Sequence, residues 1–128
     1  DHAADRALSV THMHGLRDLR GKMDTPARHA QADRFLTLTQ QIRQPGELCV
    51  LCGDFNVEPN SETLSLLSKA GFTELVTTGN HAGTRSSHYE KPGKFADYML
   101  VDELSAAKDF TVLRDPEVSD HCPLVLQV

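Results

Sequence analysis

Short apolar runs alternate with longer polar segments along this chain, which predicts strands alternating with helices. The runs with strand composition, rich in β-branched and apolar residues, cover residues 7–11, 48–52, 95–101, 109–113 and 124–128. The first of these runs ends at His12, and the second continues directly into the turn 53–56. This alternation is typical of an α/β protein.

A first helix is predicted after the polar segment 13–24. Thr25 can cap it, and Pro26 suits its first position because proline's missing N–H has no helical partner there. Pro45 and Gly46 end it. Its apolar face is expected to contain residues at helical spacing: Gln31, Phe35, Leu38 and Ile42, joined by Ala27 and Ala30.

A second helix is expected to begin at Asn60 or Ser61, with Leu64 and Leu67 on one face. Gly71 suits its left-handed stop, and Phe72 the hydrophobic contact that follows. Residues 80–94 are Gly-rich and polar, which predicts a long loop.

Composition narrows the class of protein. The 128 residues suit one domain or part of one, and 13 Lys and Arg against 18 Asp and Glu give a net charge of −5. This balance argues mildly against a domain that holds nucleic acid by bulk positive charge. A metal-dependent nuclease remains compatible, because its cation supplies positive charge. No apolar run approaches the roughly 18 to 20 residues that cross a bilayer, so no transmembrane segment is expected.

The three cysteines cannot form a closed disulfide framework. Cys49 and Cys52 stand three apart, and no second pair completes a zinc site. Residues three apart on a strand point to opposite faces, which favours plain core residues over a redox or metal role. This cysteine usage weakly favours a reducing, cytoplasmic location, and the location is otherwise unknown.

Polar residues with catalytic potential gather where the predicted strands begin or end, which is where α/β sheets build their sites. The set comprises His12, Asp54, Asn56, Asp97, Asp120 and His121. Oxygen ligands without a Cys/His tetrad suit Mg²⁺ or Mn²⁺ better than zinc. Aspartates, an amide and histidines together suit metal-assisted attack on a phosphate ester.

Each of these residues also has a structural interpretation. Asp54 and Asn56 favour turns, Asp120 can cap one, and His12 can be a core histidine bonded to a carbonyl. Asp97 is harder to explain in this way, because a carboxylate among apolar strand residues needs a buried partner. The remaining histidines are expected to be exposed and without a role: His14, His29, His81 and His88.

Four motifs stand in the order and spacing of the endonuclease/exonuclease/phosphatase superfamily, which the chain resembles over nearly its whole length. They are Thr11-His12, Gly53-Asp54-Phe55-Asn56, Asp97-Tyr98, and Ser119-Asp120-His121 with Pro123. Gly83-Thr84 also resembles that family. The superfamily includes DNase I, abasic-site endonucleases, neutral sphingomyelinases and inositol polyphosphate 5-phosphatases.

The resemblance implies half of a DNase I-like four-layer α/β sandwich, with one mixed sheet and helices on its outer face. Residues 1–128 would be the C-terminal portion of that domain. The N-terminal half, which in relatives supplies a metal-binding glutamate and an asparagine, would be absent. Without it we expect weak or no activity. We also expect a homodimer or the missing segment to cover the exposed sheet face.

The resemblance also implies roles for single residues. Asp54 would orient or deprotonate the attacking water, and Asn56 and His12 would contact the phosphate. His121 would act as base or charge stabiliser, with Asp97 fixing its tautomer. Whether the His–Asp pair or Asp54 is the general base stays open. The expected metal ligands are Asp120, Asp54 and Asn56, and the expected ion is Mg²⁺ or Mn²⁺.

The expected function is therefore a Mg²⁺-dependent phosphoric ester hydrolase, a phosphodiesterase or nuclease, whose partner is a phosphate ester such as nucleic acid. The alternatives are a phosphomonoesterase, a lipid-head-group hydrolase acting on sphingomyelin or inositol phosphates, and a non-catalytic interaction module. Residues 94–97 read Lys-Phe-Ala-Asp, where abasic-site endonucleases usually carry Trp-Arg before the Asp-Tyr pair, and this argues against abasic repair. Basic residues in the segments 13–34 and 80–94 either contact substrate phosphates or form solvated faces.

Overall fold

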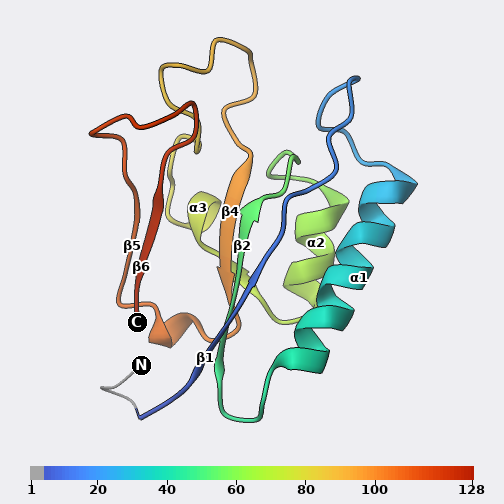
Figure 1. Ribbon diagram of the computed structural model, residues 1–128, viewed down its shortest axis with the longest axis vertical. Coiled ribbons are helices and arrows are strands. Elements are labelled where there is room, and N and C mark those ends of the chain that lie inside the picture. Colours follow the sequence, from blue (N-terminus) through green and yellow to red (C-terminus); the bar gives the residue numbers. More distant parts are fainter. Residues whose placement is uncertain (1–4) are drawn as a thin grey trace.

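A four-stranded mixed sheet forms the centre of the molecule in a computed structural model that describes residues 5–128. Its strands, in spatial order, are β1 (Leu8–His12), β2 (Leu48–Asp54), β4 (Asp97–Val101) and β3 (Thr73–Glu74). β1 runs parallel to β2, whereas β4 is antiparallel to both β2 and β3 (Figure 1). The predicted α/β class and mixed sheet are thus confirmed.

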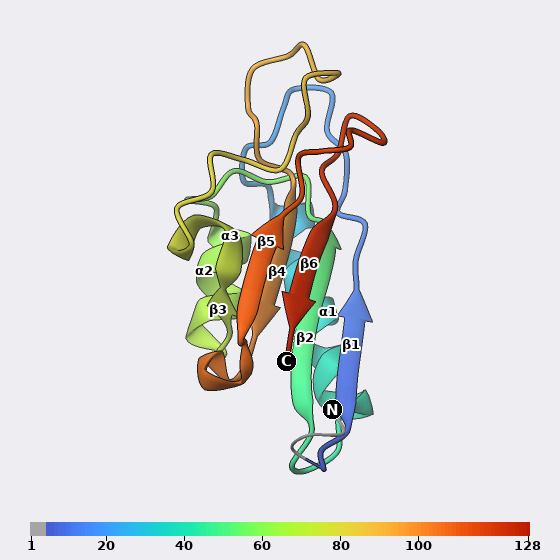
Figure 2. The same ribbon diagram turned by 90° about the vertical axis from the view of Figure 1, so that its left-hand side faces the viewer.

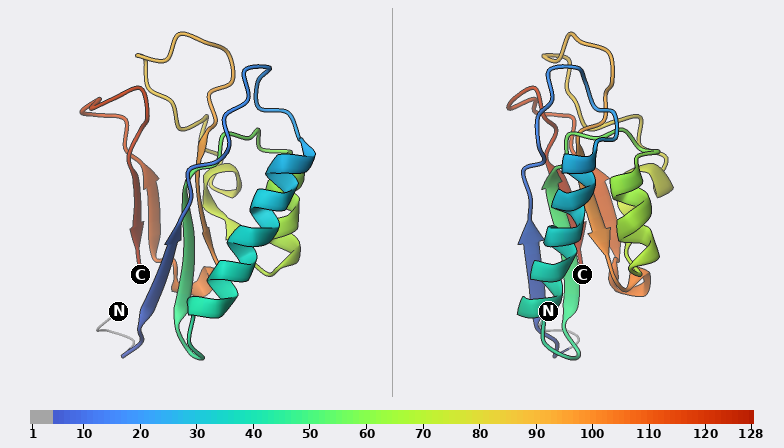
Figure 3. Two further views of the ribbon diagram at one scale, coloured as in Figure 1. Left: turned by 45° about the vertical axis from the view of Figure 1, so that its right-hand side comes forward. Right: turned by 90° about the vertical axis from the view of Figure 1, so that its right-hand side faces the viewer.

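Two helices, α1 (Pro26–Ile42) and α2 (Glu62–Lys69), cover one face of this sheet (Figure 3). Both begin as predicted. The Thr25 hydroxyl accepts a hydrogen bond from the Arg28 amide at 3.2 Å, and the Ser61 hydroxyl accepts one from the Leu64 amide at 3.3 Å. A short helix, α3 (Leu75–Thr78), follows β3 and was not predicted. No helix within residues 5–128 is long and apolar enough to cross a membrane.

The buried face of α1 differs from the predicted one. Leu38 and Ile42 are 48% and 46% exposed, so their expected burial is wrong. Arg28 and Thr39 are buried instead, beside Ala32 and Phe35. Both polar side chains have local partners. The Arg28 guanidinium donates to the Leu16, Gly21 and Met23 carbonyls, and the Thr39 hydroxyl donates to the Phe35 carbonyl. Satisfied hydrogen bonds allow such burial, which hydrophobic spacing cannot reveal.

A second, two-stranded sheet packs on the face opposite α1 and α2 (Figures 1 and 2). It pairs β5 (Asp109–Val112) with β6 (Leu124–Gln127), after the 3₁₀ turn η1 (Leu104–Ala106). The structure therefore adds a small second sheet to the single mixed sheet expected. The layers are, in order, the helices α1 and α2, the four-stranded sheet and the two-stranded sheet.

Two groups of apolar side chains hold these layers together. Phe35, Leu51 and Leu67 belong to the group between the helices and the large sheet. Leu48 and Val50 belong to the group between the two sheets, with Phe110 and Leu126 packed against them. Alternate residues of β2 serve opposite groups, as a strand buried on both faces requires.

Candidate active site

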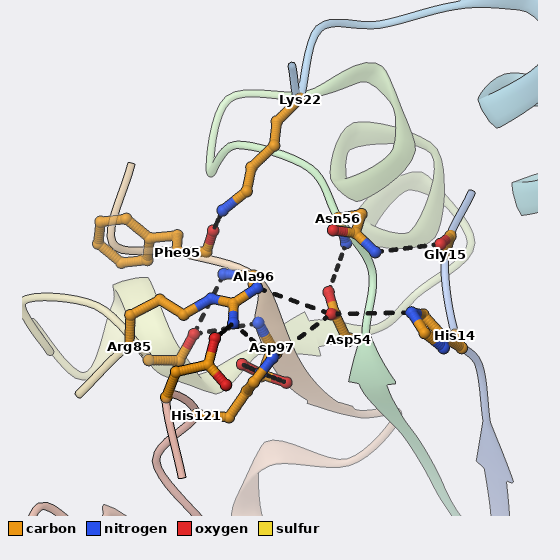
Figure 4. A network of polar contacts seen from close by, with 12 residues as sticks. His14, Gly15, Lys22, Asp54, Asn56, Arg85, Phe95, Ala96, Asp97 and His121 are labelled. Carbon is orange, nitrogen blue, oxygen red and sulfur yellow. Dashed lines mark hydrogen bonds and ion pairs between the residues drawn. The ribbon is translucent and has the colours of Figure 1, made fainter. Parts of the chain in front are cut away.

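Three titratable side chains from distant parts of the chain converge at one end of the large sheet. Asp54 is the last residue of β2 and Asp97 the first of β4, and they are direct partners across this antiparallel pair. His121, just before β6, joins them through an isolated bridge between its backbone and that of Arg85. Ligand atoms of Asp54, Asp97 and His121 all lie within 4.8 Å of one another (Figure 4).

His121 and Asp97 form a hydrogen-bonded pair. The imidazole Nδ1 lies 2.7 and 2.9 Å from the two carboxylate oxygens of Asp97. We place a proton on Nδ1, because an ionised carboxylate can only accept. Burial raises the pKa of the Asp97 carboxyl above its ordinary value, and this outweighs the lowering by the hydrogen bond from His121. Nε2 of the same ring lies 3.9 Å from Asp54 Oδ2.

A tight turn fixes Asp54 and Asn56. Gly53 has a φ of +132°, which favours glycine, and a Cβ there would overlap the Met13 carbonyl oxygen. The Asn56 amide N–H donates to Asp54 Oδ1 at 2.9 Å, and Asn56 Nδ2 donates to the Gly15 carbonyl at 3.1 Å. The turn interpretation and the site interpretation of these two residues are thus compatible, because the turn leaves Asp54 Oδ2 facing the site.

Arg85 lies at the centre of the cluster, although the sequence predicts no more for it than for the other basic residues of the segment 80–94. Its side chain is only 7% exposed, so it does not belong to a solvated face. The guanidinium Nη1 lies 2.7 Å from Asp120 Oδ2 and contacts His121 Nε2, and Nη2 lies 3.8 Å from Asp54 Oδ2. The one sequence signal near it was the family-like Gly83-Thr84 pair that precedes it.

Thr84 ties the loop 80–94 to the start of β4. Its side chain is fully buried, and its hydroxyl oxygen accepts hydrogen bonds from the Ala96 amide at 3.1 Å and the Asp97 amide at 3.0 Å. The hydroxyl therefore positions the backbone that carries the Asp97 carboxylate.

The other predicted site residues lie at different distances from this centre. Asp120 is bound to Arg85 and does not belong to the group formed by Asp54, Asp97 and His121. His12 pairs with Cys52 at the end of β1, with its ring beside Gly53. An open cleft of about 790 Å³ lies in front of the site, and its described lining includes His14 and not His12. His14, given no role from the sequence, places Nε2 4.0 Å from Asp54 Oδ2.

The chain belongs to the endonuclease/exonuclease/phosphatase family, whose model matches residues 9–121. The match spans β2 and β4, which carry Asp54 and Asp97, as well as the turn after β2 and the segment that ends in His121. Members of this family hydrolyse phosphoesters, so the chain belongs to a family of phosphoester hydrolases. A search of curated proteins gave no match.

Proposed function

We propose that this site hydrolyses phosphodiesters with the help of a divalent cation. The observation that carries the proposal is the alignment of Asp97, His121 and Asp54, in which one carboxylate holds the imidazole that faces the other. A carboxylate–imidazole pair beside a second carboxylate suits proton transfer at a phosphate ester.

In this mechanism Asp54 acts on the water. Around Asp54 Oδ2, Arg85 Nη2, His121 Nε2 and His14 Nε2 lie 3.8, 3.9 and 4.0 Å away. These separations exceed hydrogen-bond length and leave the oxygen available to a water molecule. As the water oxygen bonds to phosphorus, Asp54 accepts its proton. The ester P–O bond breaks with its electron pair on the departing oxygen, which takes a proton from solvent water.

His121 acts on the phosphoryl group. Nδ1 is held by Asp97, which fixes the tautomer and stabilises the ring when it is protonated. In the structure Nε2 accepts from Arg85 Nη1; when the ring is protonated, Nε2 gives up this contact and donates a hydrogen bond to a phosphoryl oxygen. This assigns water activation to Asp54 and charge stabilisation to the His–Asp pair.

The oxygen donors fit Mg²⁺ or Mn²⁺. Asp54 and Asp120 offer carboxylate oxygens, and Asn56 keeps its Oδ1 free as an acceptor because its Nδ2 is the atom bonded to Gly15. The carboxylates of Asp54, Asp97 and Asp120 outnumber the Arg85 guanidinium, and this excess of negative charge favours a cation. A bound ion would supply Lewis-acid polarisation of a phosphoryl oxygen.

The test uses the protein from its complete reading frame, with Asp54→Asn and His121→Gln. Each should lower Mg²⁺-dependent hydrolysis of bis(4-nitrophenyl) phosphate at least ~100-fold, the size usual for loss of an acid–base group. His29 and Asp33 on α1 are an exposed pair, 3.2 Å apart, so His29→Gln and Asp33→Asn are matched controls expected to stay active. Full activity in both site variants rejects the proposal.

A lipid head group is a second candidate substrate because of one exposed residue. Leu19 is 96% exposed and lines the cleft together with the cations Arg17 and Lys22. An apolar side chain beside cations suits a lipid surface. Faster hydrolysis of phospholipid in vesicles than of bis(4-nitrophenyl) phosphate, lost in Leu19→Ser, supports this candidate, whereas equal rates in wild type and variant exclude it.

We also propose that this chain is the C-terminal portion of the catalytic domain. β5 and β6 lie over β2 and β4 and leave β1 at the side (Figure 2). On β1, Leu8 and Val10 are 43% and 53% exposed. A preceding segment or a second copy that covers them should change their hydrogen–deuterium exchange. Identical exchange of β1 with and without the upstream reading frame, at all protein concentrations, contradicts this.

A further inference from the structure

The backbone around Arg85 is held by contacts on both sides. The Thr84 and Arg85 amides both donate to the Lys94 carbonyl, at 2.8 and 3.0 Å. The Cys122 amide donates to the Thr84 carbonyl at 2.8 Å, and the Ser86 amide donates to the Asp120 carbonyl at 3.1 Å. Arg85 therefore lies on an ordered bridge beside His121, although the segment around it has no regular secondary structure.

The guanidinium has more donors than partners. It carries five N–H groups. Within residues 5–128, Nη1 contacts Asp120 and His121, Nη2 reaches only to 3.8 Å from Asp54, and Nε is buried without a hydrogen-bond partner. A buried unpaired donor on a cation is costly, and such an exception needs an explanation.

The direction of the side chain shows which donors a ligand could reach, and these are the Nη groups beside Asp54 and His121. Arg85 lines the cleft together with Asp54 and His121, and the three side chains point toward one another (Figure 4). Because Nη1 contacts His121 Nε2, a phosphoryl oxygen that approaches this imidazole also comes within reach of the guanidinium. Arg85 can then exchange part of its contact with Asp120 for the phosphoryl oxygen.

We propose that Arg85 is a catalytic residue, whose guanidinium binds a non-bridging oxygen of the phosphoryl group and stabilises the charge that this group gains in the transition state. The proposal rests on the proposed function, because the phosphoryl group is the one attacked by the water on Asp54. Arginine suits this role because it stays charged and presents a planar fork that matches phosphate oxygens.

Tyr89 holds the plane of this fork. Its ring centroid lies 4.4 Å from Arg85 Cζ, within the range of a cation–π contact. The ammonium groups of Lys94 and Lys22 lie 5.5 and 5.8 Å from the same centroid. The ring thus limits the movement of the guanidinium on one side.

A purely structural role is the competing explanation, in which Arg85 only neutralises Asp54, Asp97 and Asp120. The two roles differ in what Arg85→Lys does. Lysine keeps the charge and removes the fork. A charge-neutralising role predicts nearly full activity for this variant, whereas phosphoryl binding predicts a large loss of kcat.

The experiment compares Arg85→Lys, Arg85→Gln and the control Lys69→Gln, which removes an exposed cation at the end of α2, outside the cleft lining. Measurements are kcat for bis(4-nitrophenyl) phosphate, binding of inorganic phosphate by calorimetry, and thermal unfolding. We expect kcat to fall ~100-fold or more in Arg85→Lys, as for loss of a transition-state donor, and less than ~3-fold in Lys69→Gln. Added guanidinium chloride should restore part of the activity of Arg85→Gln.

The outcomes separate this proposal from the proposed function. A wild-type protein that binds phosphate and does not hydrolyse the diester contradicts the proposed function, and loss of that binding in Arg85→Gln still supports the role of Arg85 in binding the phosphoryl group. A folded Arg85→Lys with wild-type kcat, or unchanged phosphate affinity in both Arg85 variants, overturns the proposal. If Arg85→Gln does not fold, the lysine variant alone decides.

Discussion

At the scale of single residues, the buried carboxyl of Asp97 lowers the stability of the folded protein when it ionises. Its carboxyl is largely buried at the first position of β4, with the His121 ring as its hydrogen-bond partner. Burial raises its pKa, so the folded protein holds a proton there more tightly than the unfolded chain does. The stabilisation associated with this proton is complete below pH 3.8, the ordinary pKa, and is lost as the pH rises through the higher folded value.

Asp97→Asn should therefore separate stability from activity. The variant cannot ionise, so its free energy of unfolding relative to wild type should increase between about pH 4 and pH 7. Its hydrolysis should fall at least ~100-fold, since an amide no longer stabilises a charged His121 ring. Chemical denaturation with EDTA across this pH range, beside diester assays, measures both. A stability difference that is constant with pH contradicts the prediction.

At the scale of elements, the loop that carries Gly83 and Thr84 determines where β4 begins. Thr84→Val keeps the shape of the side chain and removes the acceptor for two amides, the buried one of Ala96 and the half-buried one of Asp97. Each amide left unsatisfied costs about 1–3 kcal/mol. We expect a loss of about 2–4 kcal/mol in urea unfolding, together with reduced activity, because Asp97 loses the support of its backbone.

Thr84→Ser is the control for this prediction, because it keeps the hydroxyl. It should recover most of the stability and the activity. A valine variant as stable as the serine variant would show that the two amides find other partners, and the positioning role of Thr84 would then be wrong.

The elements also show how far the sequence alone could lead. Local signals such as Thr25, Ser61 and Gly71 predicted the helix ends well, because caps and stops act within a few residues. The β5–β6 pair was predicted as strands, yet its separation into a second sheet depends on packing between Phe110, Leu126 and β2. The spacing of apolar residues along the chain does not reveal such packing.

Dependence on tertiary packing also decides which residues of the site could be predicted from the sequence. Asp54, Asp97 and His121 were predictable because motif spacing and strand ends identify them, whatever the tertiary contacts. Arg85 was not, because its burial depends on Asp120 and His121, which lie 35 and 36 residues further along the chain. A loop arginine looks the same in a sequence whether it is solvated or enclosed.

At the scale of the whole molecule, the negative charge of the site affects the stability of the folded state. The chain carries a net charge of −5, and the carboxylates of Asp54, Asp97 and Asp120 are concentrated at the site around Arg85. Like charges brought together by folding destabilise the folded state. A cation that binds these groups only in the folded protein raises its stability by mass action.

Mg²⁺ should therefore raise the unfolding temperature through this one site. At an ion concentration ten times Kd the stabilisation is about 1.4 kcal/mol, which raises Tm by about 4–8 °C for a domain of this size. Sodium chloride at equal ionic strength controls for general screening of the net charge. Asp54→Asn removes one expected ligand and should abolish the specific increase, whereas Asp33→Asn, exposed on α1, should keep it. Calorimetric scans with Mg²⁺, with EDTA and with salt alone measure the difference, and an equal rise in both variants would place the bound ion elsewhere on the molecule.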